Sequence, residues 1–147
     1  MKVNRLQLEQ QAAGYTYKVV VTHEDLTEAT ADTAQVIELI NVELGEIVER
    51  VAVYMPTPFE DDSDAAFNTN TATIGDGGSA NRYLSSTELN VNGTEILAKA
   101  GTNTAGFAYV TDDTVDLTVD AMAAKSLEDI DTGELWIFIK TVKLPEF

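Results

Sequence analysis

Short segments rich in β-branched and aromatic residues recur along the chain, and clusters of Gly, Asn, Asp and Thr separate them. Short runs of this kind are typical of β-strands. They predict strands at residues 14–22, 32–42, 47–55, 71–74, 82–84, 106–110, 114–119 and 134–142, with a hairpin at residues 88–97. Residues 36–54 also fit an amphipathic helix, but Gly45 and the density of Val and Ile favour two antiparallel strands. The pattern therefore predicts an all-β, single-domain antiparallel β-sandwich that is jelly-roll-like.

Gly, Pro and Asn residues mark the expected ends of these strands. The strand at residues 47–55 should end at Pro56 and Pro58, because proline cannot donate to a ladder. Residues 75–79 (GDGGS) predict a tight turn, and Asn92-Gly93 predicts a type I′ hairpin turn. Residues 120–127 (DAMAAKSL) alone have a helical composition, so we expect at most one short helix, of one or two turns.

Residues 1–13 precede the first predicted strand and form an N-terminal arm, while residues 14–147 form the sandwich domain. The arm alternates apolar and polar residues and has no apolar core of the kind found in signal peptides. It is a candidate docking segment that could add to the edge of a partner's sheet, or else an ordinary edge strand or a frayed terminus. Its candidate interface residues are the bases Lys2 and Arg5 and the apolar residues Val3, Leu6 and Leu8.

The predicted last strand is apolar on both faces. Alternation places Leu135, Ile137 and Ile139 on one face, and Trp136 and Phe138 on the other. A sandwich strand usually has one polar face, so the second apolar face needs a cover, either a loop of the same chain or a neighbouring subunit. We therefore expect a homo-oligomer, with Trp136 and Phe138 or the reverse face as candidate contacts.

Charge and composition narrow the classes of partner. The chain has 25 acidic and 9 basic residues, a net charge of -16, which opposes binding to nucleic acid or to an anionic membrane. No apolar run is long enough to span a membrane, and the absence of cysteine excludes disulfides and thiol chemistry.

Candidate chemistry is sparse. His23 is the only histidine, and no Gly-x-Ser-x-Gly sequence presents a nucleophile. Residues 75–79 lack the Gly-Lys-[Ser/Thr] of a phosphate-binding loop. Two acidic clusters, residues 60–64 and 112–116, could supply oxygen ligands to calcium, but neither matches a calcium-binding loop. The sequence predicts no enzyme, no catalytic residue, no metal and no cofactor.

The order of segments nevertheless resembles a known class of protein. The segments that carry the resemblance are residues 22–27 (THEDLT), 57–59 (TPF), 73–77 (TIGDG), 82–84 (RYL) and 133–135 (GEL). Their succession is similar to that in small structural proteins of tailed bacteriophages, above all capsid decoration (cement) proteins. The resemblance implies a β-sandwich or jelly roll that is commonly trimeric on the outside of the capsid, and no catalytic residues.

The leading hypothesis is therefore a phage decoration protein, made in the host cytoplasm, that binds the major capsid protein on the head exterior and stabilises the shell. Many weak contacts repeated by symmetry are enough for that role. The alternative is a receptor- or glycan-binding module of a tail or head fibre, which needs an exposed aromatic platform. A small hydrolase is the third and weakest hypothesis.

Overall fold

The computed structural model describes residues 1–7, 14–64, 66–67, 69–90, 97–101 and 106–145. These residues form ten strands and two single-turn 3-10 helices. The elements are β1 (Lys2–Arg5), β2 (Tyr17–Thr22), η1 (His23–Asp25), β3 (Gln35–Val42), β4 (Glu46–Glu60), β5 (Thr71–Asp76), β6 (Ser79–Glu88), β7 (Leu97–Ala100), β8 (Phe107–Ala108), β9 (Asp113–Val119), η2 (Leu127–Asp129) and β10 (Thr132–Lys143).

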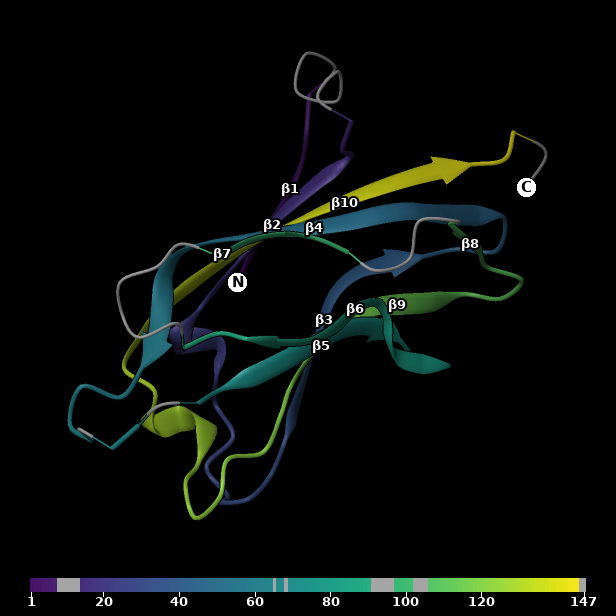
Figure 1. Ribbon diagram of the computed structural model, residues 1–147. Helices are drawn as coiled ribbons and strands as arrows, with labels where there is room; N and C mark the ends of the chain where they lie inside the picture. Colours follow the sequence, from purple (N-terminus) through teal and green to yellow (C-terminus); the bar gives the residue numbers. More distant parts are fainter. Residues whose placement is uncertain (8–13, 65, 68, 91–96, 102–105, 146–147) are drawn as a thin grey trace.

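The strands form two antiparallel sheets that lie in two layers (Figure 1). Sheet A has the order β1-β2-β10-β4-β7, with β8 also paired to β4, and sheet B has the order β3-β9-β5-β6. The chain passes back and forth between the sheets. The resulting neighbours include β2 with β10 and β4 with β7 in sheet A, and β3 with β9 and β5 with β6 in sheet B. This is the strand order of a jelly roll, so the predicted all-β antiparallel sandwich is confirmed.

The core lies between the two sheets, where alternate residues of each strand point inward. In β10, Leu135, Ile137 and Ile139 are at most 1% exposed. Val19 and Val21 of β2 are fully buried beside them, and sheet B contributes Ile74 and Leu117. Burying an aliphatic side chain of this size stabilises the fold by about 1.5–3 kcal/mol, so the inward face of β10 contributes strongly.

The predicted end of a strand at Pro56 and Pro58 is wrong, because β4 continues through both prolines to Glu60. On one side, β10 pairs with this part of β4 only irregularly, at Thr57 and Glu60, with register shifts between the pairs. On the other side, the described part of β7 pairs with β4 from Ala52 to Met55. The missing proline N–H groups therefore fall where the β10–β4 ladder is irregular.

The helical turn predicted for residues 120–127 is also wrong. An isolated bridge joins Met122 to Lys125, and Ala124 has a positive φ of 56°. The Ala124 amide donates to Oδ1 of Asp32 at 2.8 Å, which holds the segment as a turn. A segment this short is not stable as an isolated helix, so tertiary contacts decide its conformation.

Two predicted turns have different outcomes. The turn at residues 75–79 is shorter than expected, because β5 extends to Asp76 and β6 starts at Ser79. Asn92 and Gly93 lie outside the described residues.

Candidate functional site

The N-terminal arm begins as an edge strand of sheet A. Lys2–Arg5 pairs antiparallel with β2, so that Lys2 lies opposite Val20 and Arg5 opposite Tyr17. All four residues of β1, including Val3, are exposed. The Leu6 amide continues the ladder by donating to the Thr16 carbonyl at 2.8 Å. Leu8 lies outside the described residues, and a docking role for the arm stays a prediction.

Trp136 and Phe138 lie on the outer face of sheet A, where both are half-buried. Their rings belong to a row of four aromatic side chains, which we call the aromatic row. The rings of Tyr54 and Trp136 are 5.2 Å apart, and those of Tyr15 and Phe138 are 5.7 Å apart. The reverse face of β10 is core and is not available as a contact.

Cations of the same chain cover part of the aromatic row. Nζ of Lys18 lies 3.5 Å from the ring centroid of Trp136, and Cζ of Arg50 lies 4.8 Å from that of Tyr15. Nη2 of Arg50 also donates to the Gly14 carbonyl at 2.7 Å. Among the described residues, the second apolar face of β10 is thus partly covered within its own chain, by Tyr15 and by cation–π contacts.

Two more bases share this face. Lys140 alternates with Trp136 and Phe138 along β10, so it points the same way, and it lies opposite Arg50 in β4. Lys2 lies opposite Val20, which in turn lies opposite Trp136. Four of the chain's nine bases therefore lie on one side of sheet A, and we call Lys2, Lys18, Arg50 and Lys140 the basic face.

Sequence reasoning missed Lys18, Arg50 and Lys140 as candidate residues. Each has the strand parity that points outward, which the sequence alone shows. These three residues lie on one face because β2, β10 and β4 pair in a particular register, and these strands come from segments far apart in the chain. That register is set by packing of the core.

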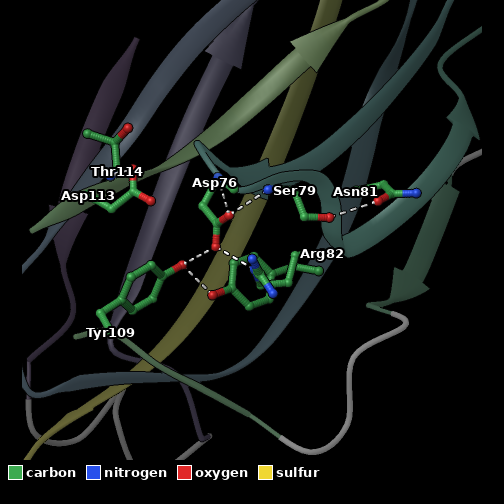
Figure 2. Close-up of polar contacts among 9 residues, drawn as sticks. Asp76, Ser79, Asn81, Arg82, Tyr109, Asp113 and Thr114 are labelled. Carbon is green, nitrogen blue, oxygen red and sulfur yellow. Dashed lines mark hydrogen bonds and ion pairs between the residues drawn. The ribbon is translucent and has the colours of Figure 1, made fainter. Parts of the chain in front are cut away.

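A second polar cluster is buried between the sheets at the end of β5 (Figure 2). Asp76 is buried, with its side chain 1% exposed, and its carboxylate accepts four hydrogen bonds. The donors are the Gly78 and Ser79 amides at 3.0 and 2.9 Å, Nε of Arg82 at 2.6 Å and the Tyr109 hydroxyl at 2.8 Å. A carboxylate engaged by four donors is a structural anchor and is poorly placed to accept a proton from a substrate.

The environment of Asp76 shifts the pKa values of the cluster. Burial by itself would raise the pKa of Asp76, but hydrogen bonds from Arg82, Tyr109 and Ser79 together hold that pKa below its ordinary value. Burial raises the pKa of Tyr83 to about 12 and also raises the pKa of Tyr109, whose hydroxyl is hydrogen-bonded to that of Tyr83. Both tyrosines therefore remain neutral at physiological pH.

Asp116 in β9 has the opposite shift. Burial raises its pKa, and the neighbouring carboxylates of Asp113, Glu38 and Asp76 add to this, against a hydrogen bond from the Thr114 hydroxyl that lowers it. Its contribution to stability is therefore fully present below the ordinary value of 3.8 and is lost as the pH rises through the raised pKa. At neutral pH the charged Asp116 disfavours the folded state.

We therefore expect Asp116→Asn to raise the melting temperature at neutral pH, because the amide keeps an oxygen for Thr114 without the charge. The gain should disappear as the pH falls through the carboxylate range. Circular dichroism melts of both proteins across this pH range measure it, with Glu24→Gln as a control at an exposed carboxylate outside this group. A lower melting temperature for Asp116→Asn at neutral pH would contradict the expectation.

The acidic cluster at residues 60–64 is held by a lysine. Nζ of Lys125 pairs with Asp61 and lies 3.1 Å from Oδ2 of Asp64. Hydrogen bonds from Lys125 and then from Ser63 lower the pKa of Asp61 to about 2. Lys125 thus pairs with two of the cluster's four carboxylates and offsets part of its charge.

The described part of the structure offers no assembled metal site. Within those residues, no three His, Asp or Glu side chains are grouped so that they could hold a metal ion. In the other acidic cluster, Asp112 is turned to the Leu44 amide at 3.0 Å, whereas Asp116 accepts from Thr114. His23 opens the turn η1, where its carbonyl accepts from the Leu26 amide. None of the described helices is long and apolar enough to cross a bilayer.

Comparisons with known proteins give matches in structure. No protein-family model matches the chain, and no curated protein does. A chain of the cyanophage Pam1 capsid asymmetric unit matches with a TM-score of 0.60 and 23% identity, over 87% of this chain and 82% of that one. A chain of the acidic stable capsid structure of Helicobacter pylori bacteriophage KHP30 matches with a TM-score of 0.51 and 12% identity, over 88% and 87% of the two chains. At these identities the likeness establishes a shared fold.

Proposed function

We propose that the protein is a non-catalytic component of a bacteriophage virion, and that it decorates the outer surface of the head by binding the major capsid protein. One observation carries the proposal: the jelly roll is shared over 87% of this chain and 82% of a chain from a phage capsid. The coverage of both chains is nearly complete, so the likeness concerns a whole domain. A decoration protein needs surfaces rather than an active site.

The chemistry of the described residues supports a binding role. The buried carboxylate of Asp76 is engaged by hydrogen bonds from its own chain, and Lys125 pairs with Asp61 and Asp64. What the molecule presents to a partner is the outer face of sheet A, with its aromatic row and basic face.

That face favours contact with protein over contact with a sugar. A glycan platform needs an open aromatic ring, whereas Lys18 lies over the ring of Trp136. The indole Nε1 of Trp136 is also engaged, since it donates to Oε1 of Glu134 at 3.0 Å. The fibre module with a glycan-binding site is therefore the weaker of the two binding hypotheses.

Binding to heads tests the proposed function. Purified protein should co-sediment with mature phage heads that lack it, and its occupancy should saturate at many copies per head. Gold-labelled antibody should then mark the whole head surface in electron micrographs. Binding to host cells or isolated tails, with none to heads, would instead favour the fibre module.

The proposal includes a homotrimer, which the resemblance to decoration proteins implies. Since the reverse face of β10 is core, and Trp136 and Phe138 are partly covered by their own chain, we assign the trimer contact to neither. Sedimentation equilibrium at high micromolar concentration should give three times the mass of one chain. A monomer at every concentration would rule out a trimer that is stable away from the shell.

A further inference from the structure

We propose that the basic face of sheet A, with the aromatic row at its centre, is the surface that docks on the shell, and that it contacts a carboxylate-rich protein surface there. This inference rests on the proposed function and names the side of the molecule and the chemistry of the partner. The basic face consists of Lys2, Lys18, Arg50 and Lys140.

The distribution of charge is the first argument. With 25 acidic and 9 basic residues, a particle with evenly spread charge would be repelled by an acidic surface. The basic face gathers four of the nine bases on one side of one sheet. Glu134 lies on the same side but is hydrogen-bonded to Trp136. Charge complementarity therefore points to an acidic partner at this face.

The second argument is that these cations have no acidic partner among the described residues of their own chain. In the described part of the chain, the ion pairs involve the N-terminus, Arg82, Lys125 and Lys143, and none of the four basic-face residues. Arg50 and Lys140 lie directly opposite each other on neighbouring strands. Like charges in that position destabilise a sheet, and a carboxylate from a partner would relieve the repulsion.

The arrangement also has the anatomy of a protein interface. Half-buried rings of Trp136, Tyr54 and Phe138 lie at the centre, and the charged groups surround them. Trp, Tyr and Arg are the residues that most often dominate binding energy at interfaces. The face is the outer side of sheet A, directed away from sheet B (Figure 1), so sheet B does not cover it.

The β1 edge continues the same surface. Lys2 projects on the side of the basic face, and β1 lies at the end of sheet A with all its residues exposed. A partner that covers the basic face would therefore reach the arm as well. This brings Lys2 of the arm onto the same surface as Trp136 and Phe138 of β10, whereas Val3 and Arg5 alternate to the other side of β1.

A single charge reversal separates docking from folding. Lys140→Glu places a carboxylate opposite Arg50, so the melting temperature should stay the same or rise. Its affinity for purified heads should fall by about tenfold or more, because the reversed charge meets the partner's carboxylates. Lys143→Glu is the matched control: it changes the net charge equally near the end of the same strand, at a residue paired with Glu43. Lys2→Glu, at the exposed edge, is a second variant that leaves the core untouched.

The outcomes are distinct. The proposal is supported if Lys140→Glu and Lys2→Glu lose head binding while Lys143→Glu binds nearly as well as wild type. It also requires that the affinity of the wild-type protein for heads decreases as NaCl is added. If both basic-face variants bind heads like wild type, the proposal is overturned while the proposed function stands. If the affinity for heads does not change with NaCl concentration, the inference that the partner surface is rich in carboxylates is overturned. If Lys140→Glu also dissociates the free oligomer, the face is a contact between copies, and docking through it is overturned. If wild-type protein does not bind heads at all, both proposals fail.

Discussion

Asp76→Asn is expected to lower the free energy of unfolding by about 3 kcal/mol, a large part of the stability of a domain this size. The side chain of Asp76 is 1% exposed, and its carboxylate is the shared acceptor for Arg82, Tyr109 and two amides of the β5–β6 turn. An amide has one acceptor oxygen and no charge, so the Arg82 guanidinium loses its counter-charge. Urea unfolding followed by tryptophan fluorescence measures the loss.

The loss should depend on pH in a defined direction. Because folding holds the pKa of Asp76 below its ordinary value of 3.8, the wild-type protein has this stabilisation in full above that value. It loses the stabilisation as the pH falls through the lowered pKa. The difference between wild type and Asp76→Asn should therefore be full at neutral pH and shrink only in acid.

Asp113→Asn is the matched control, since it removes the same charge from a partly exposed residue near the cluster. It should change stability by well under 1 kcal/mol, as is usual for surface substitutions. Equal losses for the two variants would show that net charge, and not the Asp76 network, sets the effect.

Gly75→Ala is expected to destabilise the protein by about 3 kcal/mol or more, because a side chain at this position overlaps backbone atoms. A Cβ on Gly75 would lie 2.0 Å from the carbonyl oxygen of Ser79 and 2.4 Å from the carbonyl carbon of Ala80. Backbone cannot rotate aside as a flexible side chain can, so β6 would have to move away from β5. Thermal unfolding should show a much lower melting temperature.

Gly77→Ala in the same turn provides the comparison. A Cβ there would lie 3.2 Å from Oδ1 of Asp113, a side-chain atom that can shift. We expect a change of about 1 kcal/mol or less. If Gly77→Ala is as damaging as Gly75→Ala, loss of glycine flexibility rather than close backbone approach explains the effect.

Much of the fold could be predicted from the sequence, because the hydrophobic pattern of strands reflects burial directly. The alternation in β10 predicted that Leu135, Ile137 and Ile139 share one face, and this face is buried. The errors arose where tertiary contacts override local preference. Pro56 lies in a strand because the ladder is interrupted there, and residues 120–127 form a turn in spite of their helical composition.

The candidate site could be predicted only in part. Trp136 and Phe138 were recognisable because they break the polar outer pattern of a sandwich strand. The grouping of Lys18, Arg50 and Lys140 around them depends on which strands become neighbours, and β2 and β10 lie near opposite ends of the chain. The Asp76 cluster depends likewise on Tyr109, which reaches it from a distant segment.

The central place of β10 has a consequence for biosynthesis. This strand follows all the others in the chain, yet it lies between β2 and β4 in sheet A. While a ribosome is still translating the residues before Thr132, the strand that pairs with both β2 and β4 is missing, so sheet A cannot be completed. Its pairing with β2 spans most of the chain, which is typical of slow folding. A chain that ends before β10 therefore lacks Trp136, Phe138 and Lys140 in register with Lys18 and Arg50, so the outer face of sheet A is assembled only after β10 has been synthesised.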